Sequence, residues 1–425
     1  MKTKTFLLIG ALILPLSAAA QTTPAPGREL DLAEAYKLAL ARSEQIAISG
    51  ETYLETMAKA DELLSQVKPQ ISLMGSETIQ HVPPGMSNQF LQANREQGWV
   101  TAHQPLFSGF REFLAYRAAK GLGRSAELQL ERAKQLLYQD VARAYLDLLT
   151  AQEDIRIRLS LVTITQDRVG DLKEFRKVGR ARPSELLAAQ SQLAQYLAQL
   201  ESARAAEQVA QFKLGFLTGL EERLALKPVP APVSVPDLGP ILERARTRPY
   251  VEARRSEQAA AELSVKVVSR RRWPTIAVDA NYYFQRPPSF TSEVKWDATI
   301  TGSLPLYGGG TTGTQTRQQE ARLRARRQAL SESVRTAELE AKSAHQDLLS
   351  SASITAALDN AARLAADNAK AQAEDYRLGQ VTNLDVLGSL NILQQTRLQQ
   401  NAARLDAYWS RVRLEVAAGV PGGNL

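Results

Sequence analysis

The sequence predicts a mainly α-helical chain with a small β part, built from two repeats of one pattern. Three observations lead to this prediction. Matching residues recur at a constant distance along the chain, apolar residues recur at helical spacing over very long stretches, and four short segments alternate between apolar and polar residues. Alanine, glutamine, leucine and arginine dominate the long stretches, as they do in extended helices.

The first residues predict export from the cytoplasm. Two lysines precede an apolar run over residues 6–16, and small residues follow it up to Ala20. Residues 1–20 are therefore expected to be a signal peptide, and the mature chain is expected to begin at Gln21. No later segment holds about 18 consecutive apolar residues, so the sequence predicts no transmembrane helix.

The repeat relates residues that lie 200 positions apart, such as Pro105 with Pro305 and Gly179 with Gly379. Chance similarity between two alanine-rich helices would not keep one register for more than a hundred residues. Five prolines in the segment that joins the repeats are incompatible with a helix there and predict an extended linker. The predicted units are a first repeat at 28–226, the linker at 227–240 and a second repeat at 241–420.

Each repeat is expected to run helix, strand, loop, strand, very long helix, tight turn and long helix. Helical spacing covers residues 30–67 and 238–271 at the starts of the repeats. Over residues 111–176, apolar residues recur every three, four or seven positions, which is typical of helices packed in coiled-coil style. Such a helix would be roughly 100 Å long. The strands are expected at about 69–80, 98–107, 274–285 and 294–306.

The strands are expected to face lipid on one side. Residues 294–306 place Trp296 and Ile300 on one face and Asp297 and Thr299 on the other. Strands of this length match the roughly 9–11 residues that a tilted strand needs to cross a bilayer. Aromatic residues near the strand ends resemble the interfacial girdles of membrane barrels. The aromatic residues assigned to the membrane interfaces are Trp99, Phe107, Trp273, Trp296 and Tyr307.

Four strands cannot close a barrel alone, because the smallest membrane barrels have about eight. An open strand edge is not tolerated in lipid, since its backbone groups would have no hydrogen-bond partner there. Several copies of the chain are therefore expected to share one barrel.

The same motifs occur in the same order in both repeats. Strands begin at Pro69 and Pro274, strand-to-helix junctions lie at 105–109 and 305–309, and helix tips lie at 178–186 and 376–387. Together they resemble the TolC family of outer-membrane efflux proteins over almost the whole mature chain. The resemblance implies a homotrimer with a shared 12-stranded β-barrel in the outer membrane of a Gram-negative bacterium and a hollow α-barrel in the periplasm.

The function that this resemblance implies is the exit duct of a tripartite efflux pump or a type I secretion system. Its partners would be a periplasmic adaptor (membrane fusion protein), an inner-membrane pump and outer-membrane lipid. The alternative is a periplasmic coiled-coil adaptor or structural protein. Adaptors carry one helical hairpin between β domains, and their strands do not recur in this duplicated order.

The helix tips carry the candidate site. Gly179 and Gly379 are expected to cap the long helices, and Thr382, or Ser184 in the first repeat, to cap the next ones. By resemblance, Asp385 constricts the pore entrance, although the second acid common in the family is Gly388 here. A carboxylate at this position could instead stabilise the helix N-terminus only.

Further roles follow from the tips. Glu185 is expected to hold neighbouring helices together, with Tyr376 or Arg377 as its partner. The residues that the resemblance assigns to adaptor docking are Val178, Gly179, Arg180, Leu378, Gly379 and Gln380.

No pattern of an enzyme, a metal site or a cofactor site is found. His81, His103 and His345 are far apart and the chain has no cysteine, so metal-ligand spacing is missing. The mild positive charge of an exported chain gives no reason to expect nucleic acid as a partner. Five arginines are expected to lie on a solvated or lumen-facing helix surface, or to form a positive ring inside the duct: Arg317, Arg322, Arg324, Arg326 and Arg327.

Overall fold

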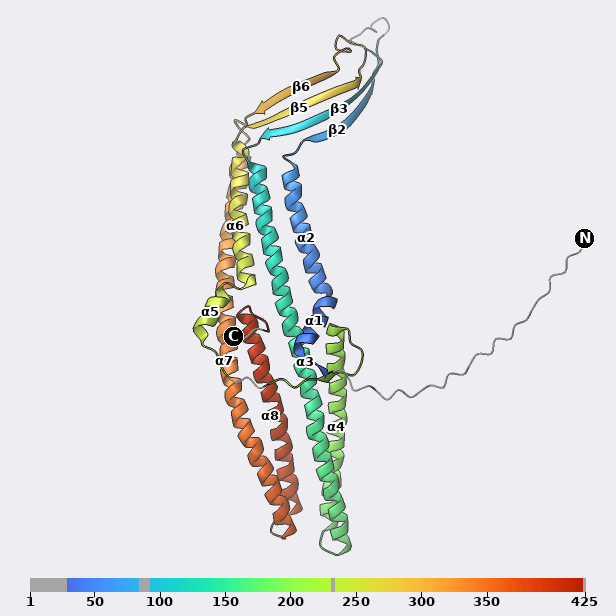
Figure 1. The fold of residues 1–425 in the computed structure, drawn as a ribbon, viewed down its shortest axis with the longest axis vertical. Helices are drawn as coiled ribbons and strands as arrows, with labels where there is room; N and C mark the ends of the chain where they lie inside the picture. Colours follow the sequence, from blue (N-terminus) through green and yellow to red (C-terminus); the bar gives the residue numbers. More distant parts are fainter. Residues whose placement is uncertain (1–28, 84–91, 231–233, 423–425) are drawn as a thin grey trace, which may run out of the picture.

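The computed structural model describes residues 29–83, 92–230 and 234–422, and the predicted signal peptide lies outside these ranges. Long helices form a rod, and a curved four-stranded sheet lies at one end of it (Figure 1). The first half contains β1 (Glu29–Leu30), α1 (Leu32–Arg42), α2 (Glu44–Ser65), β2 (Gln70–Ile79), β3 (Asn94–Phe107), α3 (Arg111–Lys177), α4 (Pro183–Thr218) and β4 (Ala225–Leu226). The second half contains α5 (Leu238–Arg246), α6 (Pro249–Ser269), the short η1 (Arg270–Arg272), β5 (Thr275–Gln285), β6 (Trp296–Ser303), α7 (Thr311–Arg377) and α8 (Asn383–Ala417).

The two halves match in the lengths of their long elements. Helices α3 and α7 have 67 residues each, and α4 and α8 have 36 and 35. The very long helix predicted at 111–176 is confirmed by α3, which is roughly 100 Å long at about 1.5 Å per residue. All four predicted strands are found within a few residues of their expected positions.

Three local details differ from the sequence prediction or add to it. The helical stretches predicted at 30–67 and 238–271 are each broken into two helices, at Ser43 and at Thr247. Helix α5 begins at Leu238, as the helical spacing predicted, so the last three residues assigned to the linker are helical. Pro240 is tolerated there because it sits in the first helical turn, where a backbone N–H is not needed. The two-residue strands β1 and β4 pair in parallel, and their brevity left no pattern in the sequence.

The main sheet is antiparallel, with strand order β2-β3-β5-β6. Its register aligns Leu73, Val100, Tyr282 and Trp296 across all four strands. Since side chains alternate along a strand, the aligned rows sort into two faces. The apolar sheet face carries Ile71, Leu73, Val100, Ala102, Val278, Ala280, Tyr282, Trp296, Ala298 and Ile300.

The opposite, polar sheet face is held by hydrogen bonds between neighbouring strands. The Nδ1 of His103 lies 2.7 Å from Oδ1 of Asp279, and the Asn281 amide donates to Asp297 at 2.9 Å. The predicted alternation of the strands is therefore confirmed, and it is continuous across the sheet.

The helices below the sheet follow the order of its strands. Helix α2 packs on α3, α3 on α6, and α6 on α7, under β2, β3, β5 and β6 respectively (Figure 1). Among the described residues, β2 and β6 each have one neighbouring strand in this sheet and form its edges. In the same way, α2 and the upper part of α7 are the edges of the helix layer.

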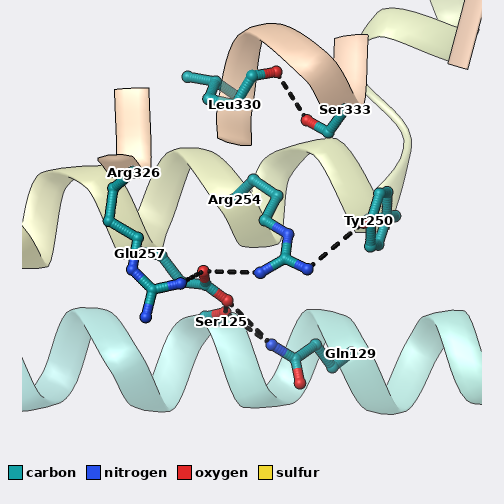
Figure 2. A network of polar contacts seen from close by, with 8 residues as sticks. All are labelled: Ser125, Gln129, Tyr250, Arg254, Glu257, Arg326, Leu330 and Ser333. Carbon is teal, nitrogen blue, oxygen red and sulfur yellow. Dashed lines mark hydrogen bonds and ion pairs between the residues drawn. The ribbon is translucent and has the colours of Figure 1, made fainter. Parts of the chain in front are cut away.

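A buried carboxylate joins three of these helices. Glu257 on α6 has a side chain that is 9% exposed and accepts hydrogen bonds on both oxygens (Figure 2). Ser125 and Gln129 of α3 donate to Oε1 at 3.1 and 3.2 Å. Arg254 of α6 and Arg326 of α7 donate to Oε2, each at 2.9 Å. The network fixes the relative height of α3, α6 and α7.

Near the middle of the rod, the apolar core gathers α1, α3, α4, α8 and the small β1–β4 sheet. The hydroxyl of buried Tyr145 donates to the carbonyls of Leu30 and Lys227, at 2.9 and 2.7 Å. Further down, a separate core cluster packs α3 and α4 against α7 and α8. Within the described part of the chain, no helix is both long enough and apolar enough to cross a membrane.

Candidate functional site

The two turns at the end of the rod farthest from the sheet share one backbone design (Figure 1). Gly179 and Gly379 have φ angles of 73° and 77°, in the left-handed region that favours glycine. The N–H of the residue after each glycine donates to the carbonyl five positions back, at 2.8 and 2.9 Å. This is the Schellman arrangement, so both glycines end their helices as predicted.

The helices that follow the turns begin differently. Thr382 caps α8, and the carboxylate of Asp385 accepts the Thr382 N–H at 2.8 Å, which completes a capping box. Helix α4 has Arg182 at the cap position with no side-chain hydrogen bond, and Pro183 opens the helix. Ser184 lies inside α4, so its predicted capping role is wrong.

Asp385 is exposed at the tip while it caps α8. Its Oδ2 also accepts the Thr382 hydroxyl at 2.6 Å. These hydrogen bonds, from the hydroxyl first and the backbone second, lower the pKa of Asp385 below its usual value. The carboxylate of a single chain therefore stays charged to a lower pH than an ordinary aspartate.

Glu185 and Tyr376 come together across two helices. The Tyr376 hydroxyl donates to Glu185 Oε2 at 3.3 Å, and Tyr376 is one of the two partners that the sequence predicted. The other, Arg377, instead lies 3.8 Å from Glu374. Burial, and secondly the charge of Glu185, raise the pKa of Tyr376, so its hydroxyl remains a donor.

Two buried residues complete this group, and the sequence reasoning missed both. The guanidinium of Arg168 lies 3.7 Å from the centre of the Tyr376 ring. Its Nε donates to Asn383 Oδ1 at 3.1 Å, and the Asn383 amide donates to the Glu185 carbonyl at 3.3 Å. The sequence signal that could have revealed Arg168 is its place among the apolar positions of α3, next to Val169.

The resulting tip cluster consists of Arg168, Glu185, Tyr376 and Asn383, and it draws on all four long helices α3, α4, α7 and α8. Burial lowers the pKa of Arg168, but a guanidinium stays protonated at any physiological pH. The cluster therefore holds the α3–α4 pair against the α7–α8 pair with a permanent positive charge at its centre.

The tips also expose apolar side chains. Val178 and Leu378, one on each tip, are 68% and 64% exposed. A Cβ added at Gly179 or Gly379 would meet nothing within 4 Å, so the surface around both glycines is open within the single chain. Arg180 lies over the ring of Phe175, 5.6 Å from its centre.

The predicted interface aromatics lie at two levels of the sheet. Phe107 and Trp273 pack at 6.4 Å at the helix end of the sheet, where Tyr307 is 89% exposed. Trp296 is 69% exposed at the far end of the sheet. The seven residues of β6 that follow Trp296 span roughly 23 Å along the strand. Trp99 pairs with Met74 and Tyr283 and so lies on the polar sheet face, opposite to Trp296.

Comparison with known proteins agrees with this geometry. Residues 35–220 match the sequence model of a family described as outer membrane efflux protein. A relative from Vibrio cholerae serotype O1, the outer membrane protein TolC, is 24% identical over 428 residues, which cover 96% of this chain and 95% of the relative.

Solved structures share the fold. The outer membrane protein VceC from Vibrio cholerae is 16% identical, with a TM-score of 0.81 over 92% of this chain and 97% of that one. The MtrE outer membrane channel of Neisseria gonorrhoeae is 17% identical, with a TM-score of 0.76 over 92% and 89%. At these identities the likeness establishes the fold alone.

The capping difference between the tips gives a testable expectation. Thr382→Ala should destabilise the start of α8 by about 1 kcal/mol and speed amide exchange there roughly fivefold, because it removes a capping hydroxyl. Ser184→Ala is the matched control and should leave α4 unchanged. Hydrogen exchange of the two helix starts measures both, and equal effects would contradict the assigned caps.

The same cap should respond to acid. The folded pKa of Asp385 is lowered, so its contribution is complete above the ordinary aspartate pKa of about 4 and is lost as the pH falls through the folded value. Protection of the first turn of α8 should therefore fall in acid, and that of α4 should not.

Proposed function

We propose that this chain, a member of the TolC-like family of outer membrane efflux proteins, is the outer-membrane exit duct of a tripartite efflux pump or a type I secretion system. The observation that carries this proposal is a sheet with one apolar face, set on helices roughly 100 Å long. A sheet and long helices combined in this way suit a duct whose sheet crosses a membrane and whose helices cross a wide aqueous space.

In the proposed assembly, three copies form a homotrimer and share one barrel. Each copy supplies four strands, and the open edges β2 and β6 of neighbouring copies pair. Closure is required because unpaired backbone groups are costly in lipid. The order of the strands supports it, since an added β6–β2 pair would also be antiparallel.

The proposed membrane band lies between two aromatic levels. Trp296 marks one interface, and Phe107, Trp273 and Tyr307 mark the other. Their separation of roughly 23 Å along the strand corresponds to roughly 18 Å across the membrane for a strand tilted by about 40°, which lies within the apolar band of about 25 Å in outer-membrane barrels. We do not extend this role to Trp99, because it lies on the polar sheet face. The helices would then extend into the periplasm.

The tips are the proposed docking surface for the periplasmic adaptor. Val178, Gly179 and Arg180 on one tip and Leu378, Gly379 and Gln380 on the other lie at the end farthest from the sheet. Exposed apolar side chains beside open glycines favour close approach of another helix, which needs small residues and apolar contact.

The tip cluster is the proposed gate, and Asp385 the proposed constriction. In this arrangement Glu185 and Tyr376 keep the two helix pairs together, and opening would separate α7–α8 from α3–α4. Asp385 lies on the exposed start of α8, where copies from three chains would gather. A ring of carboxylates in a narrow aqueous passage attracts cations and repels anions.

Single-channel recording tests the duct and its constriction together. The purified oligomer should form pores in planar bilayers, and Asp385→Asn should reduce cation selectivity while the amide oxygen can still accept the cap hydrogen bond. Glu374→Gln, an exposed charge near the same tip, is the matched control and should change selectivity little. Absence of pores would contradict the function, whereas pores with unchanged selectivity in Asp385→Asn would contradict only the constriction.

Adaptor docking has its own test. Gly379→Trp should reduce co-purification of the adaptor from envelope extracts at least about tenfold, because a bulky side chain would fill the open surface at the tip. Gly379→Asn should have a smaller effect, since asparagine tolerates the left-handed conformation. Gly170→Trp, at an open helical position above the other tip, controls for bulk alone. Equal co-purification in all variants would exclude this tip as the docking surface.

A further inference from the structure

The turn that joins α6 to the sheet carries three consecutive arginines. Arg270, Arg271 and Arg272 form the short η1, directly before Trp273 and the start of β5. Arg271 and Arg272 are exposed, and Arg270 is partly exposed. The turn lies where the helices meet the sheet (Figure 1), which is the level of the aromatic side chains at the helix end of the proposed membrane band.

The internal repeat shows that the fold of this turn does not depend on arginine. The same turn occurs 205 residues earlier, where α2 leads into β2. There the N–H of Lys68 donates to the carbonyl of Ser65 at 3.0 Å, and the N–H of Trp273 donates to the carbonyl of Arg270 at the same distance. In the first repeat, the positions of the three arginines are occupied by Ser65, Gln66 and Val67. Because these residues form an equivalent turn, the three arginines need another explanation.

The arginines have no acidic partner within the chain. Among the described residues, none of the three forms an ion pair, and each donates one hydrogen bond to a neutral group. The acceptors are the carbonyl of Gly109 for Arg270 at 3.2 Å, Oε1 of Gln315 for Arg271 at 2.7 Å and the carbonyl of Ser269 for Arg272 at 3.0 Å. A guanidinium has five N–H groups, so most of the donors and all of the positive charge remain uncompensated.

The dipole of α6 accounts for only part of this charge. Cations are favoured near the C-terminus of a helix, and Lys266 already lies in the last turn of α6. Helix α2 reaches the equivalent turn without any basic residue in its own last turn. Three additional unpaired charges at one place therefore indicate a ligand with negative charge.

The cluster stays accessible in the proposed duct. Helix α6 packs on α3 at one side and on α7 at the other, and both belong to the same chain. Neighbouring copies would meet at the edges of the sheet, at β2 and β6. The turn before β5 is thus away from the contact between copies, and its arginines face the surroundings of the duct or its interior.

Trp273 and Arg270 adjoin the apolar side of the sheet. The Trp273 ring lies 6.4 Å from that of Phe107, and the Arg270 guanidinium lies 5.3 Å from the centre of the Trp273 ring. Phe107 pairs with Ile276, which shares the apolar sheet face with Val278 two residues on. The positive cluster therefore borders the surface that is proposed to face lipid.

Apolar side chains continue from the cluster along this surface. Ile276 is 37% exposed and pairs with Gly302, and Leu304, two residues beyond Gly302, is 55% exposed. Positive charge, an aromatic ring and an exposed apolar surface follow one another along the direction in which a lipid would lie. A phospholipid has the matching order of phosphate, glycerol and acyl chains.

We propose that Arg270, Arg271 and Arg272 bind the phosphate of an anionic phospholipid in the leaflet that faces the periplasm, with its acyl chains on the apolar sheet face beside Trp273. This inference rests on the proposed function, which puts the sheet in the outer membrane. Guanidinium groups bind phosphate oxygens through paired hydrogen bonds. An anionic headgroup fits better than a zwitterionic one, because the cluster offers no carboxylate for the positive group of the latter.

The bound lipid fixes the depth of the sheet in the membrane. A homotrimer has nine of these arginines at one level, three from each copy. Attraction of basic side chains to anionic lipid acts only close to the membrane surface, so it holds this level at the headgroups.

Native mass spectrometry tests the preference for an anionic headgroup. The purified oligomer is mixed with equal amounts of phosphatidylglycerol and phosphatidylcholine in detergent, and the retained lipids are counted. The unchanged protein should retain phosphatidylglycerol at least about five times more often, which is the effect of one arginine near a charged surface. Arg270→Ser, Arg271→Gln and Arg272→Val together introduce the residues of the first repeat and should abolish the preference. Lysine at all three positions keeps the charge and should retain a smaller preference.

Two further variants serve as controls. Arg176→Gln with Arg182→Gln removes two exposed charges at the far end of the rod, roughly 100 Å away, and should leave the preference unchanged. Arg271→Gln with Arg272→Val keeps the bond of Arg270 to Gly109 and should weaken the preference even if the triple variant does not assemble. Equal retention of both lipids by the unchanged protein would overturn the proposal, and so would a preference that survives in both variants. Displacement of the lipid by inorganic phosphate would overturn the role of the acyl chains.

Fluorescence quenching by brominated lipids tests the place of binding. With Trp99, Trp296 and Trp409 changed to phenylalanine, Trp273 is the only tryptophan. Brominated phosphatidylglycerol should quench it more strongly than the same fraction of brominated phosphatidylcholine. A protein that keeps only Trp296, at the other end of the sheet, should be quenched equally by both lipids. Equal quenching of Trp273 would overturn the site.

These outcomes are separate from those that test the duct. Pores formed by an oligomer without any lipid preference would contradict this inference alone. An oligomer that selects phosphatidylglycerol through the three arginines but forms no pores would contradict the duct function and leave the lipid site standing.

Discussion

The backbone hydrogen bonds at the edges of one small sheet constrain the whole molecule. Among the described residues, β2 and β6 each pair on one side, so the N–H and C=O groups of their other sides point outward unmatched in this sheet. In water such groups bind solvent, but in hydrocarbon each costs several kcal/mol. A single chain therefore cannot place this sheet in a bilayer, although the apolar sheet face favours contact with lipid.

The helices below extend this constraint over a long distance. A rod roughly 100 Å long keeps its geometry only if its helices are fixed to one another at several heights. Glu257 does so near the sheet, Tyr145 near the middle and the tip cluster around Arg168 at the far end. Each is a buried polar group with several partners, and such groups specify one alignment more strictly than apolar packing does.

The order of helices, strands and turns could be predicted because each is determined by residues close together in the sequence. Pro274 marks the start of a strand and Gly379 the end of a helix. The alternation of apolar and polar residues indicates the strands, and the spacing of apolar residues indicates α3. The same alternation puts the side chains of Trp99 and Val100 on opposite faces of the sheet. The sequence alone could therefore have shown that Trp99 does not share a face with Trp296. Two members of the tip cluster, Glu185 and Tyr376, were predicted as partners. The contact between Arg168 and Asn383 was not predicted, because these residues lie 215 positions apart and meet only in the folded chain.

The most direct test of the central claim asks which face of the sheet touches lipid. Single cysteines along β6, at Ala298, Thr299, Ile300 and Thr301, can carry nitroxide labels in the reconstituted oligomer, since the chain has no other thiol. Relaxation by oxygen, which concentrates in lipid, should be strong at Ala298 and Ile300. Relaxation by a water-soluble nickel complex should be strong at Thr299 and Thr301. Labels that show no such alternation, or that all respond to the aqueous reagent alone, would contradict a sheet that forms the wall of a membrane channel.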